Sequence, residues 1–153
     1  MATFSSTIDY RAQPECYPYR SGEQGVFQVE PYKSELLPHW QFKNEAVARE
    51  ARDALLEHYR SYRAQEDFVG MDMARKFLQM GFTRAMRYAK YPGGRKYTDD
   101  GTERAPQEWA DAEKRRAAVV FRNAWQKVLA DPAYERLKEA HQERRSDADA
   151  PEG

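Results

Sequence analysis

The chain has 153 residues, which is the size of a single domain with a modest hydrophobic core. Hydrophobic residues make up 41% of it and charged residues 33%, and the mean hydropathy of −1.00 indicates a strongly polar surface. The 25 basic and 25 acidic residues give a formal net charge of zero, which excludes a protein that coats nucleic acid by uniform positive charge.

Cysteine content and hydropathy indicate the compartment. The single cysteine, Cys16, excludes an internal disulfide framework and fits a reducing environment. No apolar run approaches the roughly 18 residues that a membrane span needs, and residues 1–13 lack the apolar segment of a signal peptide. We therefore expect a cytoplasmic protein that does not enter a membrane.

An irregular N-terminal arm is expected over residues 1–43. It is rich in aromatic residues, and its prolines exclude long helices. Within the arm, Gly25–Glu30 alternates with period two and is followed by Pro31, a pattern typical of a short strand. Such a strand or hairpin needs a partner, which is either Ile8–Arg11 or a later segment.

Two roles are open for this arm. Its aromatic side chains suit a segment that wraps the helices and fills gaps in their core. Alternatively, Lys33, His39 and Trp40, together with Tyr32, line a ligand pocket.

The first long helix is expected over Glu45–Arg63, with Asn44 as its N-cap. His58 falls on its apolar face, where a histidine is usually a neutral core residue. The link 65–67 is short enough to make this helix an antiparallel hairpin with the next one.

The second helix begins at Phe68, and its wheel separates an apolar arc from a basic stripe. Lys76, Arg87 and Lys90 fall opposite the apolar arc, with Arg75 and Arg84 at its edges, and Asp72 is placed to pair with Lys76. Replacing Lys76, Arg87 and Lys90 by glutamate should therefore cost little stability.

The stripe continues beyond this helix. Pro92-Gly93-Gly94 ends the helix, and Arg95 and Lys96 follow at once. Residues 68–97 contain seven basic residues against one acidic residue, a charge of +6, so the rest of the chain carries −6. The sequence thus predicts a locally basic face on a neutral protein.

The remaining elements are a turn, two helices and a tail. Asp100-Gly101 is a turn signal for a small hairpin. Pro106 should start a third helix that runs to about Ala130, and Asp131-Pro132 a shorter fourth one, before a disordered tail at 146–153.

These elements predict a mainly α fold of the α+β type. A four-helix core over residues 44–145 carries the aromatic, proline-rich arm with its short strand or hairpin. Arm and core together form a single compact domain over residues 1–145.

The sequence offers no set of catalytic residues, no cofactor motif and no metal site. It lacks the glycine fingerprints of nucleotide-binding loops, and a single cysteine with His39, His58 and His141 does not make a zinc spacing. A binding protein is therefore favoured over an enzyme.

Several long segments resemble a known family. These are GEQGVFQVEPYKSELLPHWQFK, DFVGMDMARKFLQMGFTRAMRYA with its trailing GGRKY, and DPAYERLKEAH. They are similar to a family of small proteins described only as a domain of unknown function and often labelled "cytoplasmic protein". The resemblance spans about Ile8 to His141 and implies a cytoplasmic, stand-alone domain. It brings no activity or site residue with it.

Three functions are compatible with these features, besides an ordinary solvated face. The leading hypothesis is a module that binds a polyanion, nucleic acid in particular. Six basic side chains would contact its phosphates, namely Lys76, Arg84, Arg87, Lys90, Arg95 and Lys96, and the rings of Tyr91 and Tyr97 would stack on its bases.

The second hypothesis is a protein-interaction module, in which the basic face binds an acidic protein or two copies pair through the aromatic arm to form a homodimer. Met71, Met80 and Met86 supply adaptable apolar surface near the stripe. The third is an enzyme or ligand-binding protein for a phosphorylated small molecule. In it, Lys33 and His39 converge with Arg84 or Arg87.

Overall fold

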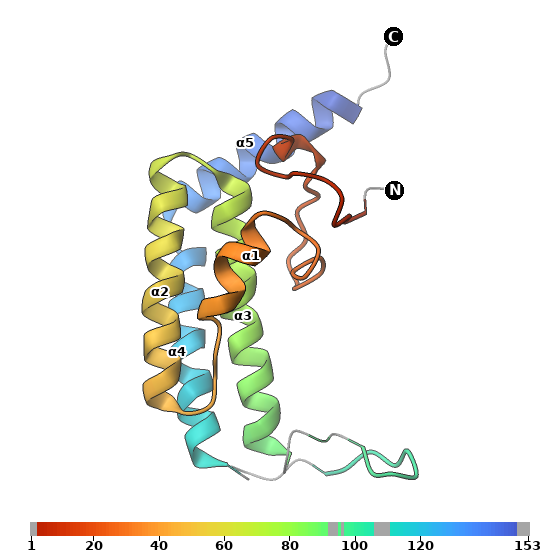
Figure 1. Ribbon diagram of the computed structural model, residues 1–153, viewed down its shortest axis with the longest axis vertical. Helices are drawn as coiled ribbons and strands as arrows, with labels where there is room; N and C mark the ends of the chain where they lie inside the picture. The colour runs from red at the N-terminus through yellow and green to blue at the C-terminus, as the bar shows by residue number, and fades with distance from the viewer. Residues whose placement is uncertain (1–2, 92–94, 96, 106–110, 150–153) are drawn as a thin grey trace.

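The computed structural model describes residues 3–91, 95, 97–105 and 111–149. Three long helices, α2 (Glu45–Ala64), α3 (Phe68–Lys90) and α4 (Ala112–Leu129), lie side by side (Figure 1). A fourth, α5 (Pro132–Asp149), crosses one end of this bundle. The arm contains only the short elements η1 (Pro14–Cys16), α1 (Tyr32–Leu36) and η2 (Leu37–His39).

Each long helix is preceded by a residue whose side chain caps its first turn. Asn44 Oδ1 accepts a hydrogen bond from the Val47 amide at 2.9 Å, which confirms the predicted start of α2. Asp67 caps α3 and Asp131 caps α5 in the same way. α4 begins at Ala112, capped by Asp111. The predicted start at Pro106 lies outside the described residues.

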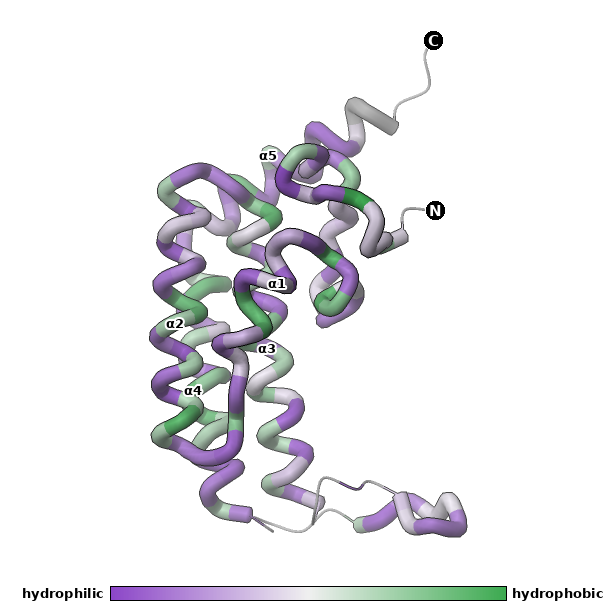
Figure 2. Tube along the Cα trace, in the orientation of Figure 1, coloured by the Kyte–Doolittle hydropathy of each residue, from purple (hydrophilic) through white to green (hydrophobic). Residues whose placement is uncertain are grey.

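The apolar faces of the helices meet in one core. Figure 2 shows hydrophobic and hydrophilic residues alternating along the long helices, as expected for helices buried on one face. α3 and α4 approach closely at Gly81, where a Cβ atom would lie 2.6 Å from the ring of Phe121. Ala74, Phe77 and Leu78, which belong to the apolar arc of the helical wheel, are all fully buried.

The arm contains no strand among its described residues, so that part of the predicted fold is wrong. Gly25–Glu30 is a series of turns: Gly25 has a φ of +81°, and Gln28 donates to its carbonyl at 3.0 Å. Val26 and Val29, three residues apart, point inward instead of alternate residues. Among the described residues, β-type pairing with the proposed partner segment Ile8–Arg11 is limited to one isolated bridge, between Asp9 and Glu30.

Aromatic residues of the arm complete the core. Tyr10, Tyr17 and Tyr32 are fully buried and belong to the same cluster as the helical side chains. The arm lies across α3 and α5 (Figure 1), so it packs as the wrapping interpretation expects.

The last helix is longer than expected, since α4 and α5 both have 18 residues. α5 continues to Asp149, so residues 146–149 are helical where a disordered tail was expected, and 150–153 lie outside the described residues. The predicted turn at Asp100-Gly101 is present, with an antiparallel bridge between Tyr97 and Glu103. In the described part of the chain, no helix combines the length and apolarity needed to cross a membrane.

Candidate functional site

The predicted basic stripe of α3 divides into two parts. Every residue from Phe68 to Leu78 is buried, because this half of α3 is covered by the other helices and by the arm. Arg84, Arg87 and Lys90, in the second half, are exposed. Only the second half therefore presents its cations to a ligand.

Lys76 lies in the buried half, and its prediction as an exposed phosphate contact is wrong. Its Nζ donates to the Gln24 carbonyl at 2.6 Å and lies 4.5 Å from the ring centroid of Phe4 and 4.7 Å from that of Tyr17. Burial lowers the pKa of the Lys76 ammonium to about 8. Lys76 therefore links α3 to the arm through these contacts.

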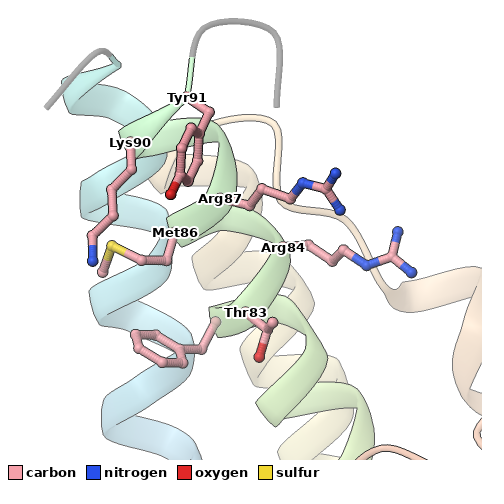
Figure 3. A pocket seen from close by; sticks show the side chains of 7 residues that line it. Thr83, Arg84, Met86, Arg87, Lys90 and Tyr91 are labelled. Atoms are coloured by element: carbon pink, nitrogen blue, oxygen red, sulfur yellow. The ribbon is translucent and has the colours of Figure 1, made fainter. Parts of the chain in front are cut away.

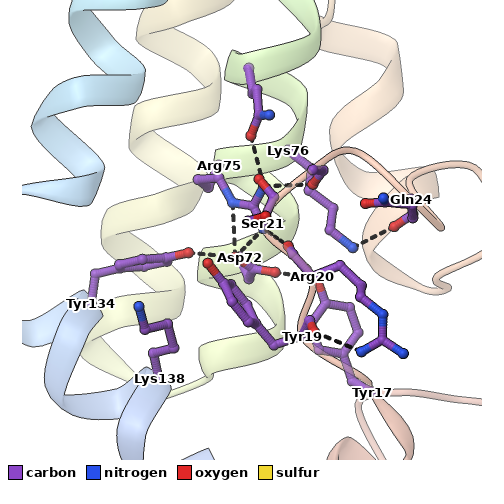
Figure 4. Close-up of polar contacts among 12 residues, drawn as sticks. Tyr17, Tyr19, Arg20, Ser21, Gln24, Asp72, Arg75, Lys76, Tyr134 and Lys138 are labelled. Carbon is purple, nitrogen blue, oxygen red and sulfur yellow. Dashed lines mark hydrogen bonds and ion pairs between the residues drawn. The ribbon is translucent and has the colours of Figure 1, made fainter. Parts of the chain in front are cut away.

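Asp72 does not pair with Lys76 but is the centre of a buried group, the Asp72 cluster, with Arg75, Tyr17 and Tyr134 (Figure 4). Arg75 donates to Asp72 Oδ1 from Nε at 3.0 Å and from Nη2 at 2.8 Å, and the Tyr134 hydroxyl donates to it at 2.6 Å. The Tyr17 hydroxyl donates to the second carboxylate oxygen. Burial raises the pKa of both tyrosine hydroxyls.

The same arginine also holds the arm. Arg75 Nη1 donates to the Gly22 carbonyl at 2.7 Å and to that of Ser21 at 3.2 Å, while Nη2 donates to the Arg20 carbonyl at 2.8 Å. The carboxylate and the guanidinium thus both have partners in the protein. We interpret the Asp72 cluster as a structural clamp, since it presents no group to a ligand.

The exposed cations surround a hollow at the C-terminal end of α3, here called the distal hollow, of about 500 Å³ (Figure 3). Its apolar lining comes from Phe82, Met86 and Tyr91 and its polar lining from Thr83, Arg84, Arg87 and Lys90. Arg84 and Arg87 extend to one side of the helix and Lys90 to the other. Tyr91, predicted to stack on a base, is only 9% exposed and lines the hollow instead.

A second hollow of about 330 Å³, the Phe27 hollow, adjoins the first and shares Thr83 and Arg84 with it. The arm contributes Glu23 and Phe27 to its lining. Burial raises the pKa of the Glu23 carboxyl, while the nearby positive charge of Arg84 opposes that shift. One acidic side chain of the arm therefore stands beside the cations.

The other predicted phosphate and stacking residues lie beyond the two hollows. Arg95 pairs with Asp99 at 2.5 Å, and Tyr97 is 51% exposed in the small hairpin. Lys96 lies outside the described residues. Of the predicted methionine surface, Met71 and Met80 are buried, and Met86 lines the distal hollow.

Lys33, His39 and Trp40 do not converge on the distal hollow. Lys33 pairs with Glu30 at 3.5 Å, and the His39 ring packs 5.1 Å from that of His58 on α2. Trp40 donates its indole N–H to the Phe77 carbonyl at 3.0 Å, inside the packing of the arm. These contacts do not bring them together with Arg84 or Arg87 as the phosphorylated-ligand hypothesis required.

Residues 2–144 match the family described as "Domain of unknown function (DUF4385)". The chain belongs to this family. The DUF4385 domain thus includes the arm, the bundle and most of α5, in agreement with the resemblance noted from the sequence. No curated protein and no solved structure matches the chain.

Within the described residues of this DUF4385 domain, no group of three or more histidine, cysteine or acidic side chains is arranged to hold a metal ion.

Proposed function

We propose that the protein binds a polyanion, nucleic acid in particular, at the distal hollow of α3. The observation that supports this is the hollow itself: three exposed cationic side chains, Arg84, Arg87 and Lys90, around an apolar lining. Arginine and lysine make charge-assisted hydrogen bonds to phosphate oxygens, and the apolar lining accommodates the uncharged part of a nucleotide.

Part of this charge has a local explanation. Arg87 and Lys90 lie in the last turn of α3, where basic side chains compensate the negative end of the helix dipole. Arg84 lies outside that turn and is closer to Glu23. A ligand phosphate at Arg84 would compete with this carboxylate.

Reversing the charge of Arg84, Arg87 and Lys90 together to glutamate should abolish binding. With three phosphate contacts, log K for a single-stranded oligonucleotide should fall with log salt with a slope of about −2. The triple variant should lose both this slope and at least tenfold in affinity. Fluorescence anisotropy of a labelled oligonucleotide at several salt concentrations measures both quantities.

A matched variant controls for the change in net charge. Arg49→Glu, Arg60→Glu and Lys127→Glu reverse three exposed cations elsewhere on α2 and α4. This variant should keep the slope of the unmodified protein and most of its affinity. Equal losses in the two triple variants would indicate a general charge effect and refute a site on α3.

Glu23→Gln should strengthen binding, because it removes the negative charge beside Arg84 while preserving the shape of the side chain. A nearby charge at a partly exposed site contributes up to about 1 kcal/mol, so the expected gain is roughly twofold to fivefold. The same anisotropy titration measures it, with the exposed Glu57→Gln on α2 as control. Unchanged or weaker binding would show that Arg84 does not contact the ligand.

A further inference from the structure

Phe27 is an exposed aromatic residue in the turn that contains Gly25. The residue is 43% exposed, although Val26 beside it is buried. The turn is fixed by Gly25, whose φ of +81° favours glycine and whose Cα packs so closely on the Phe4 ring that a Cβ would lie 2.3 Å from it. Phe27 thus lies in a turn of defined geometry and lines the Phe27 hollow.

The two hollows adjoin along α3, and together they are here called the track. The two hollows share Thr83 and Arg84. The Phe27 hollow supplies an aromatic ring, and the distal hollow supplies Arg87, Lys90 and an apolar lining. On α3 the track runs from Met80 to Lys90, a length of about 15 Å at 1.5 Å per residue. At about 3.4 Å of helix axis per phosphate of one stacked strand, this length corresponds to about four phosphates.

From this track we infer that the ligand is single-stranded nucleic acid, with one unpaired base stacked on Phe27 and its phosphates on Arg84, Arg87 and Lys90. The inference rests on the proposed function. It adds that the ligand is single-stranded and that Phe27 is the residue that distinguishes a single strand from a duplex. A phenylalanine ring stacks on any base and makes no hydrogen bond, so the expected recognition is tolerant of sequence.

The alternation of features favours a single strand over other polyanions. In a duplex both faces of each internal base are covered by its neighbours, so no internal base is free to stack on Phe27. A single strand repeats a flat base and a phosphate at every residue and so satisfies the whole track. An acidic peptide does so only where its sequence places aromatic and acidic side chains in the same order.

The test compares Phe27→Ala with Leu129→Ala, which removes an equally exposed apolar side chain, 45% exposed, at the far end of α4. Phe27→Ala should weaken binding of a short single-stranded oligonucleotide on the order of tenfold and leave its salt slope unchanged. It should not alter binding of a duplex of the same length. Leu129→Ala should change neither, and equal melting temperatures should show that both variants are folded.

A photochemical measurement locates the base directly. An oligonucleotide substituted with iodouracil should cross-link to the tryptic peptide that contains Phe27 when irradiated in the complex. An adduct found only elsewhere, or single-strand affinity unchanged in Phe27→Ala, would refute the stacking role while salt-dependent binding still supports the proposed function.

Two other outcomes overturn the inference differently. Absence of salt-dependent binding to every oligonucleotide would refute the proposed function as well. Polyglutamate binding that depends on Phe27 as strongly as single-strand binding does would assign the track to an acidic protein partner.

Discussion

Asp72→Ala is expected to destabilise the protein by about 3 to 5 kcal/mol, which is a large part of the stability of a small domain. Asp72 is fully buried and accepts hydrogen bonds from Arg75, Tyr17 and Tyr134. Its loss leaves a guanidinium that is only 1% exposed without a counter-charge and two buried hydroxyls without their acceptor. Urea unfolding followed by circular dichroism at neutral pH measures the change.

Asp53→Ala is the matched control, because Asp53 pairs with Arg52 on the surface of α2 with its side chain 70% exposed. Its cost should stay within about 1 kcal/mol. The double variant Asp72→Leu with Arg75→Met should be more stable than Asp72→Ala, because it leaves no uncompensated charge in the core. Similar stabilities for Asp72→Ala and Asp53→Ala would contradict the structural role of the Asp72 cluster.

Lys76→Glu should also destabilise the protein by about 3 to 5 kcal/mol, in contrast to the small effect expected from the helical wheel. The substitution removes the hydrogen bond to the Gln24 carbonyl and the contact with two aromatic rings. It also places a second carboxylate in the buried region that holds Asp72. Differential scanning calorimetry should show a lower melting temperature and unfolding enthalpy.

Lys90→Glu makes the same charge change on the exposed half of α3 and should cost no more than about 1 kcal/mol through the helix dipole. Lys76→Met keeps the aliphatic stem and should fall between the two variants. If Lys76→Glu melts like Lys90→Glu, then Lys76 is exposed in solution and the basic stripe is continuous.

The helices of this protein could be predicted from the sequence because their signals are local. The N-cap bond of Asn44 joins residues three apart, and Asp131 bonds an amide two residues later. The apolar arc of α3 places Phe77 and Leu78 in the core by their spacing alone. Such features depend on a few neighbouring residues. The predicted helix Glu45–Arg63 therefore agrees with α2 (Glu45–Ala64) to within one residue at each end.

The segment Gly25–Glu30 shows where a local pattern is insufficient. Alternation of polar and apolar residues specifies a strand only when another strand supplies hydrogen bonds along its length. Here the opposite segment meets it at one bridge, and the backbone closes its hydrogen bonds within turns. The result places Phe27 on the surface of the Phe27 hollow, a position that alternation does not predict.

What the sequence determined by itself was the four long helices, most of their inward faces and the excess of basic residues along α3, but not the short helices of the arm. Which of those basic residues face solvent was decided only by the tertiary structure. A helical wheel identifies the side that faces one neighbour, whereas Arg75 and Lys76 are covered on the opposite side by residues 20–24, more than fifty positions earlier in the chain. That contact depends on the path of the arm over α3, and it leaves Arg84, Arg87 and Lys90 as the exposed cations.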